Sequence, residues 1–272
     1  MDGLMKKNEG QVSVSSEQSS SQRAKDREFV VYGLNASMNV FSKRPEDLLR
    51  VFFHEDRSSK MRAVKKWCQT HKLPYRQLDN ESLNKVAASV HHECVVIVVR
   101  PMKHENIRAL IRGGLSKKSV VVALDRVSNT HNLGAILRVS AYFGIAAMIV
   151  QAEENQRFLT PSAARMAEGG MEDVPCYRCG DLASALRDLK AKGAFVLGAD
   201  LESKESIYAQ EIRFPCVVVV GNEREGLSER VKKRCDALVH VPGKGQMQSL
   251  NVAVASGVIL AELNRRQIMR NE

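Results

Sequence analysis

From Ser119 onward, short apolar runs alternate with segments of helical spacing, and this alternation limits the chain to few folds. The apolar runs lie at 120–124, 147–150, 195–198, 217–220 and 237–241, and helices fit at 133–143, 182–192, 229–234 and 251–266. Parallel strands need a long return connection, usually a helix, between one strand and the next. The pattern therefore predicts an α/β fold with a mostly parallel sheet covered by helices.

A smaller α/β unit is predicted before this region, at residues 29–102. It contains an apolar run at 48–53, helical spacing at 61–71 and a fully apolar strand at 95–99. Residues 103–118 are interpreted as a linker with a helical turn, and residues 119–272 as the larger domain. Residues 1–28 are rich in Ser and Gln. Because such a segment cannot bury enough apolar surface to offset its ordering entropy, we expect a flexible tail.

The net charge and the distribution of apolar residues limit the kinds of partner that the chain is expected to have. The chain has 41 Lys and Arg against 31 Asp and Glu, a formal net charge of +10. A polyanion such as nucleic acid is the natural partner of such a chain, although charge alone leaves RNA binding at even odds. No run approaches the roughly 20 apolar residues of a membrane span, and the N-terminus is polar where a signal peptide is apolar, so we expect a cytoplasmic protein without membrane contact. Six cysteines without regular spacing predict reduced thiols.

The first candidate motif runs from Asn129 to Arg138, shortly after a predicted strand and into a helix. Asn132 is expected to cap that helix, and Gly134 to leave its first turn open to a phosphate or a ribose. Arg138, six residues after Asn132, projects from the second turn near the same end. Taken alone, a helix cap and a solvated arginine explain this segment without any function.

The second motif follows the four valines at 217–220, which predict a fully buried strand. Gly221 ends the strand, so the backbone can approach a ligand at the edge where open α/β sheets bind theirs. Glu223 is expected to be a buried or half-buried acid beside that crevice. The alternative is a strand followed by an ordinary turn, which Gly226 alone does not exclude.

The third motif runs from Val239 to Asn251, where a strand leads into a glycine-bearing loop and then a helix. Ser249 or Asn251 can cap the helix or hold a substrate oxygen. A loop with an ordinary helix cap is an equally good interpretation of this segment alone. The loop is not a P-loop, because Gly243-Lys244-Gly245 lacks the other residues of that phosphate cradle. The first motif lacks G-x-G-x-x-G, which argues against a Rossmann dinucleotide site.

Together, the order and spacing of N-x-G-x-x-x-R, G-x-E-x-x-G and P-G…S-L-N resemble the SpoU (TrmH-like) family of the SPOUT superfamily of RNA methyltransferases. The resemblance covers about 119–268, and 29–102 looks like the small substrate-binding domain that precedes it in rRNA 2′-O-ribose methyltransferases of this family. It implies a C-terminal trefoil knot, a homodimer, and methyl transfer from S-adenosylmethionine to a ribose 2′-hydroxyl without a metal.

The resemblance also assigns site residues. Backbone around Gly221, Val241 and Leu250 would hold the adenosine moiety of the cofactor. The catalytic cluster would comprise Asn132, Arg138, Glu223, Ser249 and Asn251. The family usually assigns Arg138 to activating the ribose hydroxyl, but a free guanidine base is costly because the arginine pKa lies above about 12. Orienting a substrate phosphate is the easier role for Arg138.

Alternatives to an rRNA enzyme remain at this stage. One is a tRNA 2′-O-ribose methyltransferase, although minimal tRNA enzymes of the family often lack the N-terminal domain. Another is a non-catalytic RNA-binding protein that keeps the fold. The chain departs from the family pattern at Asn129-Thr130, where an aspartate and a proline are usual. Outside the motifs, Cys176 and Cys179 are interpreted as incidental thiols, His91-His92 as an exposed turn, and Trp67 as core.

Overall fold

The computed structural model describes residues 28–152 and 158–269, so nearly all of the predicted tail lies outside the described residues. These residues form two compact units. Residues 28–34 and 44–102 make the smaller unit, and residues 35–43 and 103–269 make the larger one. Most of helix α2 (Leu34–Lys43) therefore groups with the larger unit.

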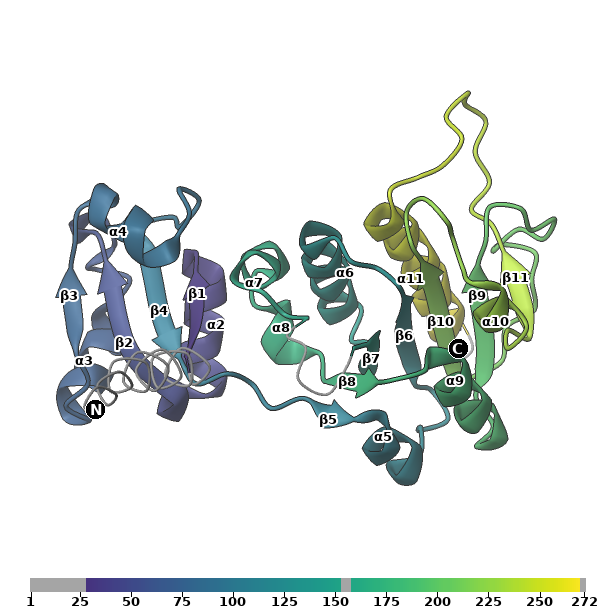
Figure 1. Ribbon diagram of the computed structural model, residues 1–272, viewed down its shortest axis with the longest axis horizontal. Coiled ribbons are helices and arrows are strands. Elements are labelled where there is room, and N and C mark those ends of the chain that lie inside the picture. Colours follow the sequence, from purple (N-terminus) through teal and green to yellow (C-terminus); the bar gives the residue numbers. More distant parts are fainter. Residues whose placement is uncertain (1–27, 153–157, 270–272) are drawn as a thin grey trace, which may run out of the picture. The chain divides into compact units, whose positions relative to one another are not determined.

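The smaller unit is built on a four-stranded sheet in the order β1-β4-β2-β3 (Figure 1). Its elements are β1 (Phe29–Tyr32), β2 (Leu48–Phe53), α3 (Arg62–Thr70), β3 (Tyr75–Gln77), α4 (Asn80–Ala87) and β4 (Val95–Val99), with short 3₁₀ turns at Pro45–Asp47 and Glu55–Arg57. Strand β4 runs antiparallel to both of its neighbours, whereas β3 pairs with β2 in parallel. All five residues of β4 are buried, as its five apolar residues predict.

The larger unit contains a seven-stranded sheet in the order β11-β9-β10-β6-β7-β8-β5. Its strands are β5 (Glu105–Asn106), β6 (Val120–Asp125), β7 (Ala147–Gln151), β8 (Cys176–Cys179), β9 (Phe195–Ala199), β10 (Cys216–Gly221) and β11 (Ala237–Val239). Its other helices are α5 (Ile107–Gly113), α6 (Thr130–Tyr142), α7 (Pro161–Ala167), α8 (Gly170–Asp173), α9 (Leu182–Ala191), α10 (Glu229–Lys232) and α11 (Val252–Met269). Every pairing in this sheet is parallel, which confirms the predicted fold class.

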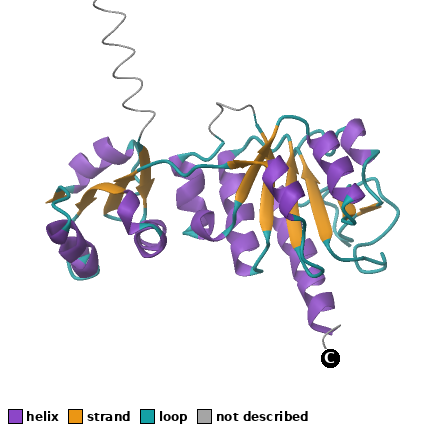
Figure 2. Ribbon diagram, turned by 90° about the horizontal axis from the view of Figure 1, so that it is seen from below, coloured by secondary structure: helices purple, strands orange, loops and turns teal. Residues whose placement is uncertain are grey.

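Helices cover both faces of the large sheet (Figure 2). Apolar residues of α5, α9 and α10 pack on one face against alternate residues of the strands, such as Val121 and Val219. Helices α6 and α11 pack against each other, and α11 also contacts β10. Because both faces are covered, the central strands β6 and β10 are buried almost throughout.

Several elements differ from the sequence prediction. Strand β8 and the short helices α7 and α8 lie where no element was predicted, and β11 ends at Val239 rather than at 241. Residues 105–113 form β5 and α5, which belong to the larger unit, where only a helical turn in a linker was expected. In the smaller unit, His92 is buried rather than exposed, because its ring contacts the Asn84 side chain and the backbone amide of Cys94.

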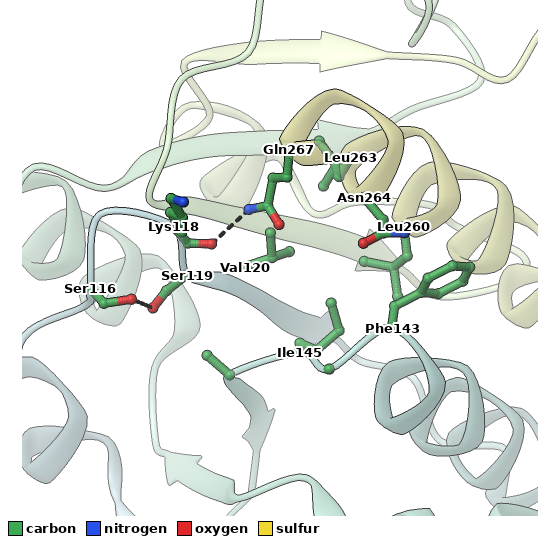
Figure 3. A pocket seen from close by; sticks show the side chains of 12 residues that line it. Ser116, Lys118, Ser119, Val120, Phe143, Ile145, Leu260, Leu263, Asn264 and Gln267 are labelled. Carbon is green, nitrogen blue, oxygen red and sulfur yellow. Dashed lines mark hydrogen bonds between the residues drawn. The ribbon is translucent and has the colours of Figure 1, made fainter. Parts of the chain in front are cut away.

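A cavity lies at each end of the strands of the large sheet, a smaller one at their amino ends and a larger one at their carboxyl ends. Figure 3 shows the smaller one, about 190 Å³, at the amino end of β6 between the ends of α6 and α11. There the Gln267 side chain donates to the Lys118 carbonyl at 2.6 Å, and Ser116 bonds Ser119. None of the predicted site residues lies in it. Among the described helices, none is both long and apolar enough to cross a membrane.

Candidate active site

The three sequence motifs follow β6, β10 and β11, so their loops all leave the carboxyl edge of the sheet. Strands β6 and β10 are neighbours, with Asp125 opposite Gly221 at their last paired position. An open cavity of about 950 Å³ lies at this edge. It is lined mainly by 220–229 and 239–250, the second and third motifs. This is the position where open α/β sheets bind ligands.

The second motif forms a closed turn at the mouth of this cavity. Asn222 and Gly226 exchange backbone hydrogen bonds of 3.1 and 2.9 Å, and Gly226 has a φ of +65°. A Cβ on Gly221 would lie 2.3 Å from the carbonyl carbon of Gly226. Both glycines are therefore required by the turn itself, and Gly221 keeps the end of β10 free of any side chain.

A chain of side-chain hydrogen bonds joins the three motifs. The Asn132 amide nitrogen donates to a carboxylate oxygen of Glu223, and the Asn132 amide oxygen accepts a 3.0 Å hydrogen bond from Asn251. The Asn251 oxygen in turn accepts from the backbone nitrogen of Ala253 at 2.8 Å, so Asn251 caps α11. The amide of Asn132 is thus fixed in one orientation, because the acceptor Glu223 and the donor Asn251 each select one end of it.

Sequence reasoning missed a second link between the first two loops. The carboxylate of Asp125, buried at the end of β6, accepts a 2.6 Å bond from the backbone nitrogen of Ser228. Arg126 has a φ of +61°, pairs with Glu225 and accepts at its carbonyl from Asn222. An acidic residue at the end of an otherwise apolar strand was the available signal, because a buried carboxylate must find donors.

Arg138 lies apart from this chain of hydrogen bonds. Its side chain, 59% exposed, pairs with Glu168 at 3.4 Å, and Arg165 pairs with the same carboxylate oxygen at 3.2 Å. A hydrogen bond from Asn35, followed by the charges of Arg138 and Arg165, holds the pKa of Glu168 below its ordinary value. The result is two guanidinium groups around one ionised carboxylate on the α6–α7 side of the site.

The structure corrects three local expectations. Asn129, not Asn132, caps α6, because its side chain accepts from the backbone nitrogens of His131 and Asn132. Gly134 is buried rather than open to a ligand, since a Cβ there would lie 2.5 Å from the carbonyl oxygen of Ala163 in α7. Glu223 is exposed rather than buried or half-buried, because it sits in the closed turn beyond the end of β10.

The three residues assigned to the cofactor, Gly221, Val241 and Leu250, line the large cavity together with Glu223 and Ser249. A volume of about 950 Å³ is enough for a nucleoside-sized ligand, and its lining combines apolar residues such as Val241 and Leu250 with charged ones such as Asp200 and Lys232. Among residues 28–152 and 158–269, no three His, Cys, Asp or Glu side chains gather where they could hold a metal ion. The cavity suits an organic cofactor bound by backbone, apolar and polar contacts.

The chain matches two described families. Residues 119–261 match the SpoU rRNA Methylase family, and residues 30–104 match the family of RNA 2′-O ribose methyltransferase substrate-binding domains. The 23S rRNA (guanosine-2′-O-)-methyltransferase RlmB of Haemophilus influenzae is 32% identical over 88% of this chain and 98% of its own length. RlmB of Neisseria meningitidis is 27% identical over 89% and 97%.

Solved structures show the same fold. The SpoU methyltransferase AviRb of Streptomyces viridochromogenes, crystallised with AdoMet, has a TM-score of 0.74 at 22% identity, over 91% of this chain and 94% of its own. The A. aeolicus TrmH/SpoU tRNA modifying enzyme has a TM-score of 0.52 at 27% identity and covers 61% of this chain. The matches to AviRb and to RlmB therefore span both units, whereas the tRNA enzyme matches a smaller part.

Proposed function

The chain belongs to the SpoU rRNA methylase family, and from that membership we propose that its larger unit transfers a methyl group from S-adenosylmethionine to a ribose 2′-hydroxyl of ribosomal RNA. The observation that carries the proposal is the hydrogen-bonded chain Glu223–Asn132–Asn251, which unites the three motifs beside a nucleoside-sized cavity. The substrate is rRNA rather than tRNA, because the RlmB relatives, which match nearly the whole chain, are named as 23S rRNA enzymes.

S-adenosylmethionine binds in the large cavity at the carboxyl edge of the sheet. The end of β10 at Gly221 and the loop at Val241 and Leu250 hold its adenosine moiety, since these positions offer backbone groups and apolar side chains. When bound, the cofactor supplies an electrophilic methyl group. The closed turn at Asn222–Gly226 packs its backbone against Gly221, so only glycine fits at the end of β10.

The catalytic cluster orients the RNA. Asn132, Glu223 and Asn251 fix one another, so a ribose entering beside them meets polar groups already in place, and little ordering entropy remains to be lost. Ser249, exposed in the loop before α11, adds a hydroxyl at the cavity wall. Arg138 clamps an RNA phosphate, because its exposed guanidinium can exchange the Glu168 carboxylate for a phosphate.

Several finer properties complete the proposal. The C-terminal part of the chain forms a trefoil knot, as in the family that it resembles, and the protein acts in the cytoplasm as a homodimer. The expected limits are 29–102 for substrate binding and 119–272 for methyl transfer, and residues 105–113, expected to lie between them, join the larger unit as β5 and α5. By its similarity to RlmB, the methylated residue is a guanosine of 23S rRNA. No metal takes part in the reaction.

Methyl transfer is tested with purified protein, S-adenosylmethionine carrying a radioactive methyl group, and total rRNA lacking the modification. We expect label in the large-subunit rRNA, and a single new 2′-O-methylated nucleotide when the RNA is mapped. Activity on tRNA alone would favour the tRNA enzyme. Binding of RNA without binding of S-adenosylmethionine in calorimetry would identify a non-catalytic protein, and loss of activity with a chelator would contradict the metal-free reaction.

A further inference from the structure

The basic side chains of the smaller unit are distributed unevenly between paired and unpaired positions. From Arg57 to Leu78 the chain has seven Lys and Arg and no acidic residue. Four basic residues elsewhere in the unit are engaged in ion pairs: Arg44 and Arg100 with Asp47, Arg50 with Glu28, and Lys85 with Glu81. Within this acid-free run, by contrast, five cations are exposed and have no acidic partner among the described residues: Lys60, Arg62, Lys66, Lys72 and Arg76.

Four of these five cations lie on or beside α3, which we call the α3 face: Lys60, Arg62, Lys66 and Lys72. Arg62 and Lys66 are four residues apart in the helix and therefore project from the same side. The opposite side of α3 is apolar, with Val64 and Cys68 buried in the unit. The helix thus anchors itself by its apolar side and presents positive charge to solvent.

The fifth cation, Arg76, projects from the face of the four-stranded sheet that lies opposite α3. Its neighbours in β3 point toward α3, since the Gln69 side chain donates to the Tyr75 hydroxyl at 2.9 Å and the Gln77 side chain donates to Ser58 at 3.3 Å. Successive side chains of a strand alternate, so Arg76 lies on the face that α4 covers. Its partner in the register, Phe52, packs in the cluster of α4.

An aromatic pair accompanies the cations of the α3 face. Trp67 and His71 are stacked with ring centroids 3.8 Å apart and planes 25° apart, and the His71 side chain is exposed. Lys65 lies 5.8 Å from the centre of the Phe53 ring and bonds Ser58, so it supports the helix rather than facing solvent freely. Cations beside an exposed aromatic ring are typical of surfaces that bind single-stranded nucleic acid, where phosphates pair with the cations and bases stack.

We propose that the α3 face is the surface with which the smaller unit binds a single-stranded segment of its RNA substrate. The inference rests on the proposed function, which identifies the polyanion as RNA. It adds that the α3 face is the binding surface and that the bound RNA is single-stranded. The four unpaired cations of the α3 face contact phosphates, and His71, supported by Trp67, receives an unpaired base. The α4 face, which carries Arg76 and the paired Lys85, does not take part.

A pair of matched double variants tests this in the full-length protein. Arg62→Gln with Lys66→Gln removes two charges from the α3 face, and Arg76→Gln with Lys85→Gln makes the same two substitutions on the α4 face. The probe is a short labelled single-stranded RNA of mixed sequence, titrated by fluorescence anisotropy at several salt concentrations. We expect the α3 double variant to bind about tenfold more weakly, with the salt slope reduced by about 1.4 for two lost phosphate contacts.

The control double variant should keep the affinity and the slope of the wild type. Equal losses in both variants would overturn the proposal, because a diffuse electrostatic field, not a surface, would then explain binding. His71→Ala should weaken binding of the single strand about fivefold while leaving binding of a duplex of the same sequence unchanged. Equal effects on both probes would overturn the assignment of a stacked base.

Methyl transfer separates this inference from the proposed function. In the α3 double variant, S-adenosylmethionine affinity and kcat at saturating RNA should be those of the wild type, and only KM for RNA should rise. A wild type that binds RNA through α3 but transfers no methyl group refutes the proposed function and leaves the surface intact. Loss of binding to vesicles containing phosphatidylserine, with RNA binding unchanged, would assign the face to a membrane and overturn the inference.

Discussion

Asn132 is the residue on which the three loops converge. Its amide has one donor bond, to Glu223, and one acceptor bond, from Asn251, so replacing it would free two loops at once. Arg138 has the opposite character, because a single ion pair with Glu168 restrains it and most of its side chain is exposed. We infer that Asn132 organises the site before RNA arrives, whereas Arg138 makes its essential contact only with RNA bound.

Arg138→Ala should therefore leave S-adenosylmethionine binding nearly intact and lower the rate of methyl transfer about 100-fold or more, as loss of a positioned transition-state contact typically does. Cofactor affinity is retained because Arg138 does not line the large cavity. Calorimetry measures the affinity, and single-turnover transfer at saturating RNA measures the rate. Arg187→Ala is the control, since Arg187 is equally exposed, at 58%, and lies on α9.

Full transfer rates in Arg138→Ala would remove Arg138 from the catalytic cluster. Arg138→Lys distinguishes its two candidate roles, because lysine supplies charge without a two-pronged grip on a phosphate. Near-normal activity of the lysine variant would indicate a simple electrostatic role, and activity as low as that of the alanine variant would indicate the bidentate clamp.

Glu262 provides a prediction for stability rather than for catalysis. Its buried carboxylate accepts from Arg265 and from Arg266, and these bonds lower its pKa from 4.5 to about 2. Arg266 also donates to the carbonyls of Ile207 and Gln210, so the carboxylate holds the arginine that ties α11 to the segment before β10. Glu262→Gln should lower the free energy of unfolding at neutral pH by about 1–3 kcal/mol.

The sign of the pH dependence follows from the direction of this shift. Because the pKa is lower in the folded state, the Glu262 carboxylate stabilises the fold above the unfolded value of about 4.5, and that contribution is lost as the pH falls toward 2. Denaturant titrations at neutral pH and near pH 3 should therefore show a smaller difference between wild type and Glu262→Gln in acid. A difference that is constant with pH would contradict the ion-pair explanation.

At the scale of elements, the long apolar strands could be predicted and the short mixed ones could not. The central strands β6 and β10 are covered on both faces, so their sequences are apolar throughout and identify them. Strand β8, Cys-Tyr-Arg-Cys, has only four residues, and β5 has two exposed ones. Both are held by backbone pairing to strands that are remote in sequence, which no local pattern records.

Part of the candidate site could be predicted once the parallel strands were identified. Motifs that follow strands of one parallel sheet must meet at its carboxyl edge, so proximity of Asn132, Glu223 and Asn251 could be expected. The ion pair between Arg138 and Glu168 could not, since Glu168 is the C-cap residue directly after α7, a helix too short to leave a periodic signal. The packing role of Gly134 was hidden for the same reason, because α7 is the element that crosses it.

Two glycines on the facing helices α6 and α11 should respond to alanine in opposite directions. Gly134→Ala places a Cβ 2.6 Å from the Cβ of Met166, so α6 and α7 must separate, and the free energy of unfolding should fall by about 1–3 kcal/mol. In Gly257→Ala the new Cβ meets only Val139, at 3.7 Å, so the higher helix propensity of alanine should raise stability by about 0.5–1 kcal/mol. Denaturant titration measures both, and destabilisation by Gly257→Ala would show that the α6–α11 contact is closer than described.

At the scale of the whole molecule, we propose that the homodimer forms through α6 and α11, where some of the exposed apolar side chains of the larger unit lie. Tyr142 at the end of α6 is 84% exposed and Val254 in the first turn of α11 is 53% exposed. Met247 and Leu250 are exposed in the loop before α11. Large exposed apolar side chains mark interaction sites, and a twofold dimer uses the same patch on both subunits. We therefore expect the homodimer to form through α6 and α11.

Val254→Glu should convert that dimer into a monomer, because each subunit would bury an unpaired carboxylate in the contact. Sedimentation equilibrium should give twice the chain mass for the wild type and the single chain mass for Val254→Glu. Val90→Glu is the matched control, since Val90 is an exposed valine of the smaller unit, at 68%, and its replacement should leave the dimer unchanged. A wild type that sediments as a monomer at micromolar concentration would reject the homodimer. A Val254→Glu variant that remains dimeric would instead place the contact on another surface of the molecule.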